Sequence, residues 1–337
     1  MKHKDRNELE SRLQKAFEGQ PQSFANKVPF KLSAVINITV LIPLKNIDFW
    51  ERHIRFLHDK VSEPRGGRFW GAIRWKQPSI SVLDLCSWDG HRREYALKAA
   101  NTGLPNSFFV ILFLRRLNDW VPQVRDAARG TLETAINNTD PNEVAKALIY
   151  VFQHWTSWQR INEQSKELLL CVLYNDEVFN KVKELLIKEN AGPLSRILTQ
   201  IGRIDILDSH LAEIAKCSVQ PALRAKAFRF LLEKKVSWYH GREWVWTDKR
   251  YGEGKLKPVI KTRSLTVEPL LSQLIEEAAH DPSSIVRRVS AEMLIGNLDS
   301  LDGRAYHLAK YFSRDTSKAV SERGKFALKK LAGESIF

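Results

Sequence analysis

A residue spacing that recurs along the chain is the feature that most constrains its fold. Counting from Asp119, a β-branched residue, Val124, follows at the fifth position, Arg125 at the sixth, Ala128 at the ninth and Leu132 at the thirteenth. The last two positions lie one turn apart on the same helix face, so the small and apolar side chains form one stripe. The spacing therefore predicts an amphipathic helix that begins at an acidic capping residue.

The same spacing returns far along the chain with every position filled by similar chemistry. Asp281 is followed by Val286, Arg287, Ser290 and Leu294 at the same offsets. A helical unit of this kind cannot bury its apolar stripe alone and needs a neighbouring unit to cover it. We expect Asp119 and Asp281 each to begin the second helix of a helical pair that stacks on adjacent pairs.

Other copies of the spacing are less regular. Ser218 is followed by Arg224 at the sixth position, and we expect the Ser218 hydroxyl to cap its helix. After Asp315, Ser321 takes the place of the arginine. Most starts are about 30 to 37 residues apart, a period typical of helical repeats. The remaining starts are Asp89, whose loop is one residue shorter, Thr156, which lacks the arginine, and Glu189, the weakest match.

Asp119, Pro122 near the turn and the Val124–Arg125 pair, with the small residue and leucine that follow, resemble the HEAT repeat. That repeat is a helix-turn-helix unit whose neighbours stack into a curved array. The resemblance covers about residues 85 to 333, with gaps in the middle. It implies an all-α fold, a right-handed α-solenoid of HEAT-like helical repeats, with an N-terminal cap region and one β-hairpin insertion.

The resemblance also implies a role for the charged residues. In HEAT repeats, the aspartate and the arginine six residues later form a ladder between neighbouring repeats. Contact with a ligand is the alternative role for the same charges. The serine that replaces the arginine at Ser321 indicates that the ladder ends at a terminal capping repeat. The expected ladder residues are Asp119, Arg125, Arg224, Asp281 and Arg287.

We expect four segments along the chain: a cap or divergent helical region over 1–84, repeats over 85–235, an insertion over 236–268 and repeats over 269–337. The first segment is rich in tryptophan and basic residues, which either pack in a core or stack on the bases of a single-stranded nucleic acid. These residues are Trp50, Trp70, Trp75 and Trp88, interleaved with Arg52, Arg55, Arg65, Arg68, Arg74 and Lys76.

The insertion over 236–268 contains two β-prone runs on either side of a glycine-containing turn, which predicts a β-hairpin. Insertions into repeats often lie on the binding face, so the hairpin is the candidate contact element. The alternative is a flap whose tryptophans pack on neighbouring helices. The candidate binding residues are Trp238, Arg242, Trp244, Trp246, Lys249, Arg250 and Tyr251.

The charge of the chain favours an anionic partner. Its formal net charge is +14 and its isoelectric point is about 9.6, which suits nucleic acid, an acidic protein or an anionic membrane surface. Solvated lysines on an ordinary basic protein are the alternative. We expect a protein partner, with nucleic acid as the second possibility.

Sequence features that bear on location favour the cytoplasm. The three cysteines, Cys86, Cys171 and Cys217, are far apart and are expected to be buried, reduced thiols. The charged N-terminus has no apolar signal core. The longest apolar run, Val35 to Leu44, is about half the roughly 20 residues that a membrane helix needs. We therefore expect no membrane span.

Motifs of catalysis are missing from the sequence. It contains no HExxH, GxSxG or GxxxxGK[ST] pattern, and its nine histidines have no metal-ligand spacing. We predict no catalytic, metal-binding or cofactor-binding residues and no cofactor, and we interpret the chain as a non-catalytic binding or scaffold protein. One enzymatic alternative stays open, because the basic charge and helical repeats resemble HEAT-like alkylpurine DNA glycosylases. Trp88–Asp89 and Asp119–Trp120 resemble such a site, although both aspartates are explained as helix caps.

Overall fold

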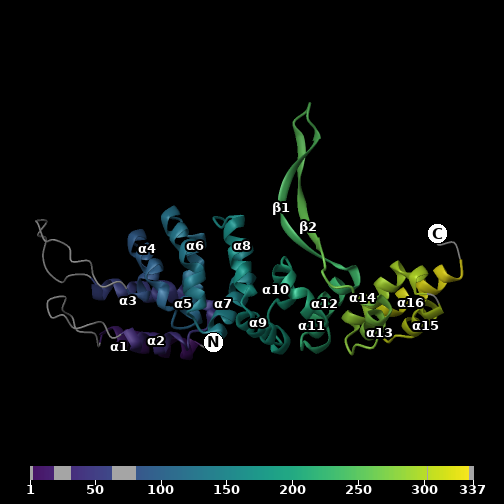
Figure 1. Cartoon of the computed structure of the whole chain (residues 1–337), viewed down its shortest axis with the longest axis horizontal. Coiled ribbons are helices and arrows are strands. Elements are labelled where there is room, and N and C mark those ends of the chain that lie inside the picture. The colour runs from purple at the N-terminus through teal and green to yellow at the C-terminus, as the bar shows by residue number, and fades with distance from the viewer. Residues whose placement is uncertain (1–2, 19–31, 63–80, 302, 334–337) are drawn as a thin grey trace, which may run out of the picture. The chain divides into compact units, whose positions relative to one another are not determined.

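The computed structural model describes residues 3–18, 32–62, 81–301 and 303–333 (Figure 1). In these ranges the chain forms sixteen α-helices and one two-stranded antiparallel sheet. The prediction of a mostly helical chain that carries one β-hairpin is therefore confirmed.

The chain divides into two compact units, Met1–Val182 and Lys183–Phe337. The point of division lies inside helix α9 (Asp176–Lys188), a segment in which the repeat spacing is weak. The helices before it are α1 (His3–Glu18), α2 (Leu32–Thr39), α3 (Ile47–Ser62), α4 (Gly90–Lys98), α5 (Ser107–Arg115), α6 (Pro122–Asn137), α7 (Pro141–His154) and α8 (Glu163–Cys171).

The second unit contains seven further helices and the sheet. The helices are α10 (Leu194–Ile201), α11 (Leu211–Cys217), α12 (Pro221–Glu233), α13 (Leu271–Ala279), α14 (Ser284–Gly296), α15 (Gly303–Ser313) and α16 (Lys318–Leu331). The strands are β1 (Lys235–Asp248) and β2 (Glu253–Ser264), and they lie between α12 and α13 in the sequence.

Helices that are two apart in the sequence pack on each other within each unit. In the first unit, α4 packs on α6 and α5 packs on α7. In the second, α12 packs on α14 and α14 packs on α16. Helix α5 is apolar at every position from Phe108 to Leu114, and all of these residues are buried, as expected for a helix surrounded by others. These helices thus bury apolar side chains against the equivalent helix of the next pair.

The prediction that Asp119 and Asp281 cap their helices is wrong in detail. Helix α6 begins at Pro122 and α14 at Ser284, three residues after each aspartate. Each carboxylate instead accepts the backbone N–H of the residue two positions on, at 2.9 Å from Val121 and 2.7 Å from Ser283. Such a bond closes a turn before the helix, which leaves the carboxylate able to bind other donors.

Ser218 does not cap its helix either. Its hydroxyl donates to the Ile214 carbonyl oxygen at 2.6 Å, on the preceding helix, and Gln220 occupies the N-cap position of α12. Asp89, by contrast, is the N-cap of α4 and accepts the His91 N–H at 2.9 Å. The backbone bond that a hydroxyl makes to the previous turn competes with capping.

The residue three positions before each second helix defines what we call the loop position. It is Ser87 before α4, Asp119 before α6, Ser218 before α12, Asp281 before α14 and Asp315 before α16. The first copy of the repeat therefore starts at Ser87, and with this start no shortened loop is needed.

In three repeats, an arginine six residues after the loop position connects the repeat to the next one. Arg93 Nη1 donates to the carbonyl oxygens of Ser87 and Trp88, at 2.8 and 2.9 Å. Its Nε and Nη2 donate to the two carboxylate oxygens of Asp119, at 2.9 and 2.8 Å. Arg224 binds Asp281, and Arg287 binds Asp315, through the same pair of nitrogens. Each arginine is thus held by its own loop while it binds the aspartate of the following loop.

These pairs hold their carboxylates ionised. Burial alone would raise the pKa of Asp119, but hydrogen bonds from Arg93 and from the Val121 N–H, together with the charge of Arg116, lower it below its ordinary value. The hydrogen bonds from Arg287 lower the pKa of Asp315 in the same way. The ion pairs therefore persist at neutral pH.

The thiols differ in part from the prediction. Cys86 is buried, and burial raises the pKa of its thiol, but Cys171 and Cys217 are exposed at the ends of their helices. All three are free. Cys171 and Cys217 are the last residues of α8 and α11, so their position at a helix end, and not the apolar character of the thiol, decides their exposure.

We expect Arg93→Ala to lower the free energy of unfolding by about 3 kcal/mol, because removal of one partner leaves a buried carboxylate with fewer donors. Arg116 still pairs with Asp119 at 3.0 Å, which keeps the loss at the low end for a buried ion pair. Urea denaturation followed by circular dichroism measures the change.

The matched control is Arg288→Ala, which removes a guanidinium from a largely exposed pair with Glu292 at 3.6 Å. Its cost should stay below about 1 kcal/mol. Equal losses for the two variants would contradict a special role for the buried pair.

Candidate functional site

The most exposed regular element among the described residues is the hairpin of β1 and β2. The two strands pair antiparallel from Lys235 opposite Ser264 to Asp248 opposite Glu253, and the register shifts at two places, after Tyr239 and after Trp246. Figure 1 shows the hairpin extending away from the helices that hold its base. The hairpin is thus tied down only at one end.

Arg263 fixes the base of the hairpin. Its Nη1 and Nη2 donate to the two carboxylate oxygens of Asp208, at 2.8 and 2.6 Å, and its Nε donates to the Gly202 carbonyl oxygen at 2.7 Å. Thr266 N–H donates to the same carboxylate at 2.8 Å. Burial tends to raise the pKa of Asp208, but these bonds lower it overall. Val236, opposite Arg263, is fully buried beside Gly202.

The register separates the side chains of the hairpin onto two faces, because residues directly opposite each other share a face. One face, which we call the aromatic face, carries Tyr239, Arg242, Trp244, Trp246, Leu256, Pro258 and Ile260. The other, which we call the lysine face, carries Trp238, Glu243, Val245, Lys255, Lys257, Val259 and Lys261. The hairpin is therefore amphipathic.

Solvent reaches the aromatic face along its length. Trp244 is 49% exposed and Trp246 is 50% exposed, and Tyr239, Leu256 and Ile260 are also exposed. The two indoles contact each other edge to face, with ring centroids 5.6 Å apart. Trp244 also covers Gly254, where a Cβ would lie within 2.6 Å of the indole. The two indoles thus pack on each other and keep about half of their surface exposed.

The other candidate residues predicted from the sequence lie at the two ends of the hairpin. Trp238 is half-buried near the base, with the Arg203 guanidinium 5.7 Å from its ring centroid. Lys249, Arg250 and Tyr251 form the exposed tip. The structure thus brings Arg242, Trp244 and Trp246 together on one face and leaves the tip as a separate basic cluster.

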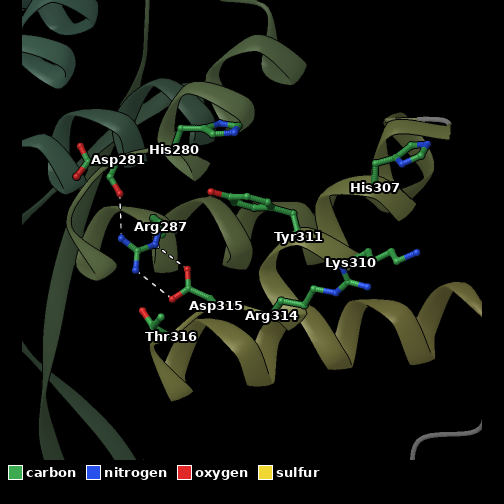
Figure 2. Close-up of a pocket in the computed structure, with 9 residues that line it drawn as sticks. All are labelled: His280, Asp281, Arg287, His307, Lys310, Tyr311, Arg314, Asp315 and Thr316. Carbon is green, nitrogen blue, oxygen red and sulfur yellow. Dashed lines mark hydrogen bonds and ion pairs between the residues drawn. The ribbon is translucent and has the colours of Figure 1, made fainter.

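A hollow in the second unit was not predicted from the sequence. It encloses about 710 Å³ between α13, α14 and α15 (Figure 2). The His280 and Tyr311 rings lie 5.1 Å apart at one wall, and Lys310 and Arg314 lie on another. The lining carboxylates, Asp281 and Asp315, already bind Arg224 and Arg287. The basic residues at 307, 310 and 314 on one side of α15 were the available signal.

The first unit has a second hollow, of about 410 Å³, beside the loop that carries Asp119. It is lined by Trp120, Trp158 and a stacked pair, Tyr150 and His154, whose ring centroids are 4.2 Å apart. Its three carboxylates all bind arginines: Asp119 binds Arg93 and Arg116, Glu51 binds Arg55 and Arg116, and Asp48 binds Arg115. The hollow thus lacks the free carboxylate that base excision would require.

The two tryptophans of the N-terminal segment that the structure describes lie in different surroundings. Trp50 is fully buried between its neighbours and is a core residue. Trp88 is exposed, with the Arg55 guanidinium 4.3 Å from its ring centroid. Trp70, Trp75, Arg65, Arg68, Arg74 and Lys76 lie outside the described residues.

Comparison with protein-family models gives no match for this chain, and neither does comparison with curated proteins. Within the described ranges, no group of three His, Cys, Asp or Glu side chains is placed to hold a metal ion. In the same ranges no single helix is long and apolar enough to cross a membrane, and α2 with the segment Leu44–Lys60 would meet that test only as a pair bent by 110°.

Arg263→Ala should release the base of the hairpin without unfolding the helices, because the variant removes the hydrogen bonds that tie β2 to Asp208 and Gly202. We expect faster amide hydrogen exchange over residues 235–264, measured by mass spectrometry.

Arg242→Ala is the matched control, since Arg242 lies on the same hairpin with its side chain exposed. It should leave exchange at the base unchanged. Similar exchange in the two variants would show that Arg263 does not hold the hairpin.

Proposed function

We propose that this chain is a HEAT-like helical-repeat protein of the cytoplasm, without catalytic activity, that binds a macromolecular partner. Support for a right-handed solenoid of repeats comes from two features of each unit. Helices two apart in the sequence pack together, and arginine–aspartate pairs link one loop position to the next. Nearest-neighbour contacts of this kind are what a stacked repeat array requires.

The aromatic face of the hairpin is the proposed contact surface. It is the observation that carries the proposal, because contiguous exposed apolar side chains on a folded protein mark interaction sites. Tryptophan, tyrosine and arginine are the residue types enriched where protein interfaces gain most of their affinity. Leu256, Pro258 and Ile260 add aliphatic surface, which favours a protein partner over a nucleic acid at this face.

Trp244→Ala together with Trp246→Ala should reduce binding of the partner at least 10-fold while the melting temperature stays within about 2 °C of wild type, because both indoles are half exposed and support no helix. The measurement is capture of the partner from cell lysate, with thermal denaturation in parallel.

Tyr306→Ala removes an equally exposed aromatic ring from α15 and serves as the control. A large drop in melting temperature for the double variant would contradict the proposal and support a packing role for the indoles.

Nucleic acid is the second candidate partner, and the lysine face favours it. The hairpin from Lys235 to Ser264 carries eight Lys or Arg residues and three Asp or Glu residues. A two-stranded ribbon is also narrow enough to enter the major groove of DNA. On this alternative the lysine face would contact phosphates while the aromatic face stays on the outside.

A salt titration distinguishes the two partners. If phosphate contacts dominate, log K should fall linearly with log salt, and Lys255→Ala, Lys257→Ala and Lys261→Ala together should lower the slope by about 3. Fluorescence anisotropy with a labelled duplex measures both quantities. An affinity that does not change with salt would exclude the nucleic-acid alternative.

A further inference from the structure

The series of arginine–aspartate pairs is interrupted after α6. Helix α8 begins at Glu163, and Asn162 is its N-cap. The loop position, three residues before the helix, is therefore Arg160, and the start predicted at Thr156 is wrong. The repeat that follows Asp119 thus carries an arginine where the following repeats in the second unit carry Asp281 and Asp315.

Arg125 lies six residues after Asp119 and corresponds to Arg93, Arg224 and Arg287. Its Nη1 donates to the carbonyl oxygens of Asp119 and Trp120, at 2.7 and 3.4 Å, as the corresponding arginines do to their own loops. Those arginines use Nε and Nη2 to bind the next aspartate. In the part of the chain that the structure describes, these two nitrogens of Arg125 have no acceptor. The guanidinium is held in place with two donors unused.

Two contacts hold the loop of Arg160 beside the loop of Asp119. The Arg160 N–H donates to the Asn118 side-chain oxygen at 2.8 Å. Arg129 Nη1 lies 3.5 Å from the Ser165 hydroxyl, where α6 packs beside α8. By their places in the repeat, Arg125 and Arg160 therefore correspond to the arginine and the aspartate that pair elsewhere. Among the described residues no carboxylate pairs with either guanidinium.

The residue after the loop position is an exposed tryptophan in two successive repeats, and the one nearer these arginines is Trp120, whose carbonyl oxygen accepts from Arg125. Trp120, which follows Asp119, is 68% exposed, and Trp88, in the same position of the preceding repeat, is 70% exposed. Trp120, Trp158 and Arg160 line the hollow of about 410 Å³ together with the stacked Tyr150 and His154. The hollow thus offers aromatic side chains beside Arg160, and Trp120 connects it to Arg125.

We infer that Trp120, Arg125, Trp158 and Arg160 form a binding site for single-stranded nucleic acid, separate from the hairpin. Arg125 and Arg160 bind a phosphate through paired N–H donors, as the corresponding arginines bind carboxylates. The indoles stack on bases, which are unpaired and accessible only in a single strand. An acidic peptide would satisfy the arginines but would leave the exposed Trp120 indole without a planar partner.

Substitution of Arg160→Asp tests the site because it supplies the carboxylate that the series of pairs lacks. The new carboxylate should bind the Nε and Nη2 donors of Arg125, so the variant should bind a labelled 15-nucleotide DNA strand at least 10-fold more weakly. Its melting temperature should equal or exceed that of wild type. Fluorescence anisotropy and thermal denaturation of the full chain give the two readouts.

The charge-matched control is Arg12→Asp, which makes the same change of charge at an exposed position of α1. It should change affinity less than 3-fold. Trp120→Ala should weaken binding about 10-fold through lost stacking, without lowering the melting temperature.

Three results would overturn the inference. The first is that Arg160→Asp retains wild-type affinity. The second is that this variant melts well below wild type, which would mean that the new carboxylate does not pair with Arg125. Polyglutamate could compete with the DNA strand as well as unlabelled DNA does, which would identify an acidic peptide as the ligand.

Discussion

The bidentate ion pair between an arginine and the aspartate of the following loop is the interaction on which each unit depends. It joins residues that are 26 positions apart in the case of Arg93 and Asp119, and 57 apart in the case of Arg224 and Asp281. The longer separation includes the whole hairpin, yet the contact is the same. A pair with this geometry fixes the distance and the orientation of successive helices, which apolar packing alone leaves free to slide. It therefore lets an insertion enter the chain without disturbing the stacking.

Burial makes these pairs costly unless every donor and acceptor is used. The first unit meets this requirement with an extended network in which charges alternate. Arg116 binds both Glu51 and Asp119, and Arg55 and Arg93 bind the two ends. Burial tends to raise the pKa of Glu51, but the surrounding arginines lower it overall. The consequence for function is that the carboxylates in this region hold the structure together and are not available for acid–base chemistry.

The sequence predicted the helical class and the hairpin, because these depend on local periodicity and turn residues. It did not predict that Asp119 pairs with Arg93 of the preceding repeat, since that contact joins residues 26 positions apart. It misplaced the starts at Asp89 and Thr156, because apolar residues at helical spacing match in more than one register, whereas Ser87 and Arg160 are identified only once the first residues of α4 and α8 are known. The faces of the hairpin could not be predicted either. An extra residue at each register shift, at His240 and at Thr247, breaks the simple alternation of side chains.

The exposed aromatic face does not stabilise the fold, and it leaves apolar side chains in contact with water. Half-exposed tryptophans on a two-stranded hairpin risk pairing with other chains, and isolated hairpins are marginally stable in water. The contacts of Arg263 and Val236 at the base of the hairpin keep the strands paired. The lysines of the lysine face repel one another between like chains and so oppose their association. Burial of the exposed indoles would become favourable only when another molecule covers them, because the hairpin holds them away from the helices of its own unit. The same reasoning applies to Arg125: the loop carbonyls hold its guanidinium in place, and the next loop that the structure describes carries Arg160 where an aspartate would pair with it.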